Sequence, residues 1–202
     1  MTYYPLAIYN SLELVTAPST SPVTLAEAKS QLRVDFSDDD TLIQRLIDTA
    51  TSFMDAQGVL GRAMIQQTWA QWLSPNPNQI VYFAMSPFIS LVSIHYYNSA
   101  NSLTAATDSN FEVLGTKNEK TISPKTDYSW PTTYERSDAI KLTFHAGYGS
   151  AITNVPQSVR QAMLLLVSHW YENREQTVMN RLENIPYGFE ELMSTERASY
   201  YG

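Results

Sequence analysis

The sequence contains no cysteine, which excludes disulfide bonds and thiolate chemistry and fits assembly in a reducing cytoplasm. Basic residues are also few, because 13 Lys and Arg stand against 20 Asp and Glu, giving a net charge of -7 at pH 7. Non-specific nucleic-acid binding depends on basic side chains that neutralise phosphates, so this composition argues against it. No apolar run approaches the roughly 20 residues that a membrane span needs. The start, MTYYPLAIYN, lacks the basic and apolar regions of a secretory signal.

Apolar residues are plentiful enough for a folded core. The chain has 202 residues, of which 44% are hydrophobic and 12% aromatic. This composition excludes general disorder and suits one domain of ordinary size or a core with one insertion.

Two helices are predicted near the N-terminus. Thr24 and Glu27 have the spacing of a capping box, in which each side chain satisfies a free backbone N–H of the first turn. The next segment, SDDDTLIQRLIDTATSFMDAQG, places Ser37 as a plausible N-cap and Gly58 as a C-terminal stop. Three consecutive aspartates follow Ser37, where the helix dipole favours negative charge, so we interpret them as capping residues rather than a metal site.

The middle of the chain is typical of β-structure. Five short segments rich in β-branched or aromatic residues are separated by Pro, Asn, Ser and Gly: IQQTWAQWL, QIVYF, LVSIHYY, FEVL and AIKLTFHAGYG. The last segment alternates most clearly, with Ile140, Leu142 and Phe144 on one face of the predicted strand. Two long polar connections, NSANSLTAATDSN and SPKTDYSWPTTYERSD, join these strands. We therefore predict a small antiparallel sheet.

Helical periodicity returns in NVPQSVRQAMLLLVSHWYENRE, where Pro156 suits the first turn. Its broad apolar face predicts a helix at the centre of the core, formed by Val159, Ala162, Met163, Leu166, Val167 and Trp170. Pro186 opens a last amphipathic helix that carries Phe189, Leu192 and Met193.

These elements predict an α+β fold in which the N- and C-terminal helices form a small bundle and an antiparallel β-rich region is inserted between them. The predicted boundaries are an extended arm over 1–21, a helical core over 22–61 and 154–196, a β-rich insertion over 62–149 and a tail over 197–202.

Chemical sites are weakly supported. His169 and Glu172 share a helix face, but a metal site needs three or four ligands, and His95 and His145 lie on separate predicted strands. The zincin pattern, a Cys/His framework and the G-x-S-x-G elbow are all absent. GYGS at 147–150 lacks the spacing of a phosphate-binding loop, so its glycines are predicted to turn the chain from strand to helix. We expect no enzymatic activity, no metal and no cofactor.

The order of these segments resembles that of the phage head–tail connector (adaptor) proteins, which also occur in gene transfer agents. The resemblance spans roughly 21–195 and is carried by SPVTLAEAKSQLRVD, by DDDTLIQRLIDTATSFMD and by the strand-turn-helix block from Ala139 to Glu175 with its HWYENRE ending. None of these segments is a catalytic motif, so the resemblance depends on the order of helical and strand segments along nearly the whole chain.

The resemblance implies a structural virion protein located in the neck, at the head–tail interface, and assembled in the host cytoplasm without a membrane. Family members form a ring, typically of twelve copies, between the portal protein and a downstream tail-completion or stopper protein. DNA passes through the channel of the ring, and the acidic composition suits a channel wall that does not retain it.

Candidate partner-binding residues follow from exposed aromatic and helix-end positions. We predict that the last helix and tail dock on the portal, and that the aromatic β-region contacts neighbouring copies. The candidates are Trp130, Tyr134, Tyr171, Arg174, Phe189, Leu192, Met193, Tyr200 and Tyr201. An alternative is a tail or baseplate module that binds a receptor or carbohydrate through the aromatic β-region. A metal-dependent hydrolase centred on His169 is a third possibility.

Overall fold

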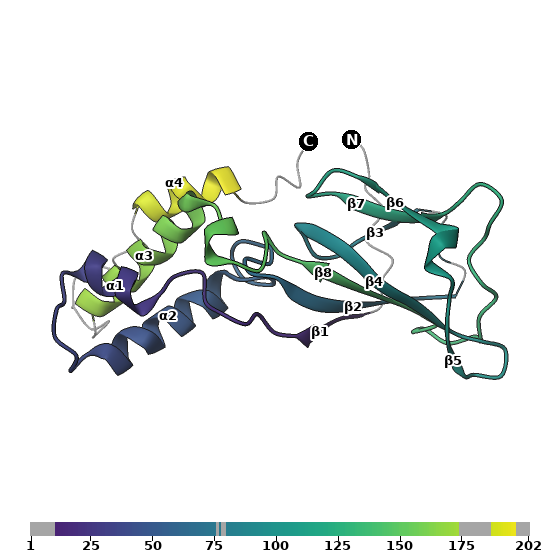
Figure 1. The fold of residues 1–202 in the computed structure, drawn as a ribbon, viewed down its shortest axis with the longest axis horizontal. Coiled ribbons are helices and arrows are strands. Elements are labelled where there is room, and N and C mark those ends of the chain that lie inside the picture. The colour runs from purple at the N-terminus through teal and green to yellow at the C-terminus, as the bar shows by residue number, and fades with distance from the viewer. Residues whose placement is uncertain (1–10, 76, 78–79, 174–186, 197–202) are drawn as a thin grey trace, which may run out of the picture. The chain divides into compact units, whose positions relative to one another are not determined.

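The computed structural model describes residues 11–75, 77, 80–173 and 187–196. The chain divides into two compact units, each built from two separate stretches of sequence. The β unit comprises 1–17 and 66–147, and the helical unit comprises 18–65 and 148–202 (Figure 1). The predicted α+β fold class is confirmed. The finer predicted boundaries of arm, core, insertion and tail stay a prediction.

Four α-helices build the helical unit. They are α1 (Leu25–Leu32), α2 (Asp40–Met54), α3 (Gln157–Glu172) and α4 (Tyr187–Glu196). Helix α3 contacts each of the other three, so it is the central element of this unit. Pro186, predicted to open the last helix, lies outside the described residues.

The start of α1 has the predicted capping box. The Thr24 backbone N–H donates to Glu27 Oε2 at 2.9 Å, and the Glu27 N–H donates to Thr24 Oγ1 at 3.2 Å. Both bonds satisfy amide groups that have no partner inside the helix. Arg33, in a left-handed conformation with φ 57°, ends this helix after two turns.

Helix α2 differs from the prediction at both ends. Its N-cap is Asp39 rather than Ser37, whose carbonyl instead accepts a bond from the Asp40 N–H at 3.1 Å. The helix also ends at Met54, before the predicted stop at Gly58. Gly58 belongs to the following turn, where a Cβ atom would lie 2.2 Å from the Phe53 carbonyl oxygen. The glycine was a correct signal for a turn, but the turn begins after the helix has already ended.

Helix α3 buries the face predicted for it. Five of its residues are at most 1% exposed: Val159, Ala162, Met163, Leu166 and Val167. Trp170 packs on this core and meets Phe53 edge to face, with ring centroids 6.1 Å apart. The helix begins one residue later than predicted, with Pro156 as the N-cap.

Two antiparallel sheets build the β unit, where one was predicted. The larger has the order β1-β2-β8-β4-β5, formed by β1 (Ser11–Thr16), β2 (Gln67–Leu73), β8 (Ile140–Ala146), β4 (Phe88–Tyr97) and β5 (Leu103–Ala105). The smaller has the order β3-β7-β6, formed by β3 (Val81–Tyr82), β7 (Lys120–Pro124) and β6 (Phe111–Gly115). Two short 3₁₀ helices, Asp108–Asn110 and Ile152–Asn154, complete the described elements.

Buried side chains connect the two sheets. Phe83 lies 4.4 Å from Phe88 and 4.9 Å from Phe144 between ring centroids, so one aromatic cluster joins β4 and β8 to the segment after β3. Gln71, only 1% exposed, donates from Nε2 to the Tyr82 carbonyl and accepts at Oε1 from the Ala84 N–H, both at 2.9 Å. From a strand of the larger sheet, the amide therefore satisfies one backbone group of β3 and one of the segment that follows it.

Three strands escaped prediction. β1 lies within the segment that was predicted as an extended arm, β5 lies within the first polar connection, and β7 overlaps the start of the second. β5 has only three residues, and β7 contains Lys120, Ser123 and Pro124, which are unfavourable in strands. Whether these segments form strands therefore depends more on pairing with a neighbouring strand than on their own composition.

Replacing Gln71 should test the link between the sheets. We expect Gln71→Leu to lower the free energy of unfolding by about 1 kcal/mol, because it removes the partner of two part-buried backbone groups. Urea denaturation followed by tryptophan fluorescence measures the change. Gln57→Leu, at an exposed position, is the control and should cost less than about 0.5 kcal/mol. Equal losses from both substitutions would contradict a special role for Gln71.

The α1 cap predicts a pH dependence. The backbone N–H of Thr24 holds the pKa of Glu27 below its ordinary value of 4.5, and Arg160 adds to the effect. Because the folded-state pKa is lowered, this contribution to stability is complete above about pH 4.5 and is lost as pH falls through the folded value. In Glu27→Gln we expect a smaller decline of the melting temperature from pH 5 to pH 3 than in the wild type. An identical decline in the two proteins would show that the cap carboxylate does not contribute.

Candidate partner-binding surfaces

His169 has a local structural role. It lies in the last turn of α3, where its carbonyl oxygen accepts a bond from Asn173 Nδ2 at 2.9 Å, and the same nitrogen lies 3.3 Å from the ring Nδ1. Glu172, its predicted companion, is exposed. These contacts belong to the end of a helix rather than to a reactive centre.

The other two histidines lie in the larger sheet. His95 on β4 is opposite Lys141, and His145 on β8 is opposite Ser90, with its Nδ1 3.2 Å from Thr68 Oγ1. Within the described parts of the chain, no three His, Asp or Glu side chains gather closely enough to hold a metal ion. No described helix is long and apolar enough to cross a membrane.

The GYGS segment makes the predicted turn from β8 toward α3. Gly149 has a φ of +157°, and a Cβ at this position would lie 2.4 Å from Asn154 Oδ1. That oxygen accepts a bond from the Ala151 N–H at 3.0 Å, so the asparagine closes the turn that the glycine permits. The segment thus has a conformational function.

The long connection before β8 carries two of the predicted partner-binding residues. Trp130 is half-buried and packs on Phe111, with ring centroids 4.9 Å apart. Tyr134 has a 44% exposed side chain, and its backbone N–H donates to the Tyr97 carbonyl at 2.9 Å. Trp130 therefore holds the connection against the smaller sheet, whereas Tyr134 presents its ring to the surface.

Charged groups fix the end of this connection. Arg136 donates from Nε and Nη2 to the two carboxylate oxygens of Asp138, at 2.6 and 2.7 Å, and its guanidinium lies 3.6 Å from the centre of the Tyr97 ring. Hydrogen bonds from Arg136 keep the pKa of Asp138 below its ordinary value. The bidentate pair and the stacked ring together orient the chain as it enters β8.

The candidates at the C-terminal side fall into three groups. Phe189 and Met193 of α4 are fully buried in the core of the helical unit, whereas Leu192 is half-buried beside it. Tyr171 is half-buried and donates its hydroxyl to Asp39 Oδ2, which links α3 to the start of α2. Arg174, Tyr200 and Tyr201 lie outside the described residues. Among the described C-terminal candidates, Phe189 and Met193 are therefore enclosed by the helical unit, whereas Leu192 and Tyr171 are partly accessible.

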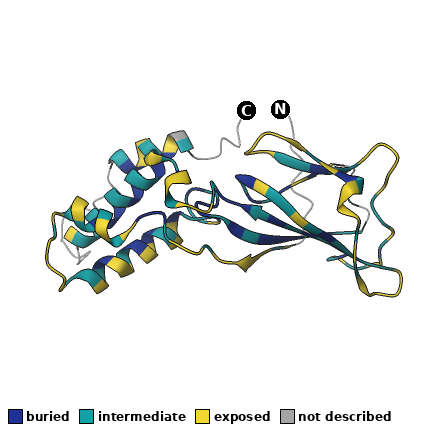
Figure 2. Ribbon diagram, viewed as in Figure 1, coloured by how far each residue is buried: buried dark blue, intermediate teal, exposed yellow. Residues whose placement is uncertain are grey.

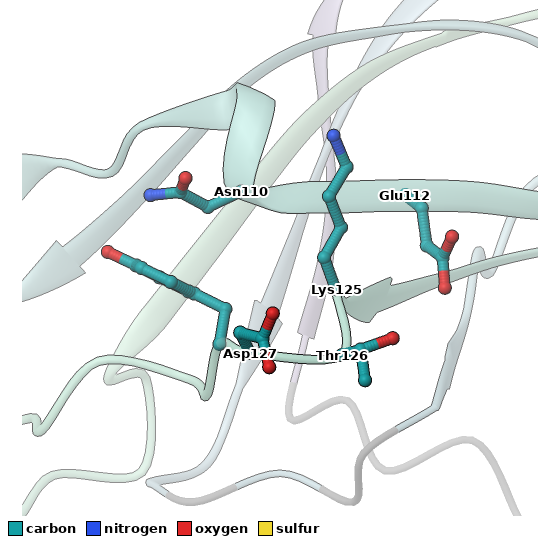
Figure 3. Close-up of a pocket in the computed structure, with 6 residues that line it drawn as sticks. Asn110, Glu112, Lys125, Thr126 and Asp127 are labelled. Carbon is teal, nitrogen blue, oxygen red and sulfur yellow. The ribbon is translucent and has the colours of Figure 1, made fainter.

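An open pocket lies beside β6, in a place that the sequence did not indicate. Its lining combines one lysine with two carboxylates and neutral polar groups: Asn110, Glu112, Lys125, Thr126, Asp127 and Tyr128. Figure 3 shows the Lys125 side chain between Asn110 and Glu112. A mixed polar lining of this kind suits an ordinary solvated surface.

Exposed aliphatic side chains on sheet edges are a second feature that sequence reasoning missed. Leu14 and Val15 of β1 are 44% and 50% exposed, and Ile89 and Val92 of β4 are 37% and 44% exposed. Alternating strand patterns alone cannot reveal them, because such patterns do not show which face of the sheet is covered, and the pairing register shifts at Val15, Ile89 and Val92.

Comparison with solved structures identifies the fold. A chain from the neck of an empty gene transfer agent particle, computed with C6 symmetry, matches with a TM-score of 0.72 and 17% identity, covering 93% of this chain and 95% of that one. A chain from the virion of the native particle matches with a TM-score of 0.68, 17% identity and coverages of 92% and 94%. A chain from the neck of the native particle, computed with C12 symmetry, matches with a TM-score of 0.66 and 16% identity, covering 93% of this chain and 94% of that one. At such identities the likeness shows a shared fold.

A helical unit interrupted by a β unit is thus a fold shared with chains of gene transfer agent particles. The chain belongs to the phage gp6-like head–tail connector protein family, whose model matches residues 22–126. This is a structural family rather than an enzymatic one, and the resemblance inferred from sequence is confirmed. The match includes LAEAKSQLRVD but not the block from Ala139 to Glu175. No curated protein sequence matches the chain.

The local role of His169 can be tested directly. We expect His169→Ala to change the free energy of unfolding by less than about 1 kcal/mol, because it removes contacts at one helix end only. Addition of Zn²⁺ to chelator-treated protein should leave the melting temperatures of both proteins unchanged. A Zn²⁺-dependent rise that disappears in the variant would instead reveal a metal site.

Proposed function

We propose that this head–tail connector forms a ring in the virion neck, between the portal protein and a downstream tail-completion or stopper protein. The observation that carries the proposal is the match of more than nine-tenths of the chain to neck components of gene transfer agent particles, together with the family membership. Necks computed with six- and twelve-fold symmetry support a symmetric assembly, and we propose twelve copies.

DNA would pass through this ring without specific binding. The net charge of -7 supports a wall that does not hold the phosphate backbone, since retention would require clustered Lys and Arg. Assembly would take place in the host cytoplasm, where a chain without cysteine needs no oxidation step. The family assignment favours this function over a receptor-binding tail or baseplate module.

The predicted contact residues differ in burial, which separates residues that support the fold from candidates for binding a partner. Phe189 and Met193 act as internal supports of α4, because their side chains are already enclosed by the protein's own helices. Leu192, Tyr171 and Arg174, with Tyr200 and Tyr201 of the tail, remain candidates for the portal side. Trp130 and Tyr134 remain candidates for contact with neighbouring copies, with Tyr134 the more exposed of the two.

Deleting residues 197–202 tests the portal side, because the deletion leaves the buried anchors of α4 in place. We expect the truncated chain to keep the wild-type melting temperature and to lose binding to purified portal rings. Sedimentation of the mixed proteins measures binding, and electron microscopy of the wild-type complex should show a second ring coaxial with the portal. A matched variant, Tyr134→Ala, should still bind the portal.

Two results would contradict these assignments. Full portal binding by the truncated chain would exclude the tail as the docking element. Wild-type protein at the tail tip, rather than beneath the portal, would exclude the connector function itself.

A further inference from the structure

The larger sheet has two edges that are open for pairing. β1 forms one end of the strand order, so no described strand lies on its outer side. At the other end, β5 pairs only with His95–Tyr97 and leaves the first part of β4 uncovered. An uncovered strand presents unpaired N–H and C=O groups to any strand that can lie alongside it.

The open part of β4 has defined ends. The Phe88 N–H donates to the Lys117 carbonyl at 3.0 Å, and the Ile94 N–H donates to Asp108 Oδ1 at 3.2 Å. Between these two bonds, residues 89–93 pair with β8 on the inner side and with no described strand on the outer side. We call residues 89–93 the β4 slot.

Protection of the two edges against strand addition is limited to Glu13 and to the irregularities of the pairing register. Neither β1 nor the β4 slot contains Lys, Arg or Pro, and Glu13 is the only charged residue in either segment. Exposed positions occur on both strands (Figure 2), and the exposed apolar residues among them include Val15, Ile89 and Val92. All three lie at irregularities of the pairing register with β2 or β8. The backbone groups of an open edge can pair with an added strand unless something covers them.

Strand direction makes the two edges complementary to each other. Each strand of the larger sheet is antiparallel to its neighbours, so β1 and β4, separated by β2 and β8, run in opposite directions. A second copy that continues the sheet in the same orientation would therefore bring its β1 to β4 as an antiparallel strand, which keeps the alternation unbroken.

We propose that β1 of one copy pairs with the β4 slot of the next copy, and that this pairing is a subunit contact of the ring. This inference depends on the ring proposed above. A contact between two different surfaces of the same chain is heterologous, and repetition around an axis closes it into a ring. The six residues of β1 exceed the five of the slot by one, a difference of about 3.4 Å.

Because β1 has one residue more than the slot, complete overlap permits two antiparallel registers, with Val15 opposite Ile89 or opposite Ser90. We propose the first register, which places the start of β1 opposite Val92 and Ser93. A parallel addition would place Val15 near Val92 instead. The polarity of the contact can therefore be tested by cross-linking.

The full-length chain suits disulfide cross-linking because it has no cysteine of its own. We expect Val15→Cys combined with Ile89→Cys to give, after oxidation, a ladder of covalent dimers, trimers and larger species on a non-reducing gel. Within one chain the two positions are separated by three strand spacings, about 14 Å, which is too far for a disulfide. Any bond between them must therefore join two copies.

Three controls make this result specific. Val15→Cys combined with Leu114→Cys, which places the second thiol at a 52% exposed position on β6, should give no ladder. Val15→Cys alone should give little dimer, and abundant dimer would indicate a two-fold β1–β1 contact that overturns the proposal. Preferential cross-linking of Val15→Cys to Val92→Cys rather than to Ile89→Cys would also overturn it, because this indicates parallel addition.

A second measurement does not depend on cross-link geometry. Val15→Lys and Val92→Lys each place a charge on an edge without disturbing the core, because both side chains are exposed in the single copy. We expect each to weaken self-association at least about tenfold by analytical ultracentrifugation, while Leu114→Lys leaves it unchanged. Unchanged association in both edge variants would overturn the pairing.

Failure of this contact can be distinguished from failure of the connector function. If the edge variants still form a complete ring on the portal, strand pairing is wrong and the connector function stands. If the Val15→Cys, Ile89→Cys protein forms the covalent ladder but the wild-type protein does not bind the portal, the pairing stands and the function is wrong. A wild-type chain that remains monomeric at all concentrations, with no ladder from the cysteine pair, rejects the pairing.

Discussion

Burial of one face of α3 is the interaction on which the helical unit depends. Its apolar residues contact helices that precede the β unit in sequence as well as the helix that follows α3. Arg160 strengthens the same junction, since its Nε donates to the Pro22 carbonyl at 3.2 Å and its Nη2 to the carboxylate of Glu27. The helical core therefore forms only when residues more than 130 positions apart come together.

Local chemistry explains why much of this fold was predictable. The Thr24–Glu27 cap, the apolar face of α3 and the alternation of β8 each depend on residues that are close in sequence. Ends of elements were less predictable: Gly58 indicated a turn, yet the helix had already ended at Met54. Strand β1 was missed because its partner, β2, is distant in sequence. Strands β5 and β7 pair with their neighbours in sequence, β4 and β6, but their short or polar composition does not indicate a strand.

The predicted partner-binding residues show a second limit of prediction from sequence. An amphipathic helix at the end of a chain has one apolar face, and the pattern is the same whether that face meets another protein or the protein's own core. For Phe189 and Met193 the structure shows the second arrangement. The family, in contrast, was recognisable because the order of caps, strands and helices persists over nearly the whole chain, even where identity with the neck structures is only 17%.

The place where the chain leaves and re-enters the helical unit has a consequence for folding. The Tyr148 N–H donates to the Met64 carbonyl at 3.1 Å, and Gln67 pairs with Ala146 shortly beyond. Bringing Met64 and Tyr148 together closes the loop formed by the residues between them, and the entropic cost of closing a flexible loop grows with the logarithm of its length. Once β2 and β8 have paired, that cost is already met, and the two halves of the helical core are held at high effective concentration. Pairing of β2 with β8 thus lowers the entropic cost of bringing the two sequence segments of the helical core together.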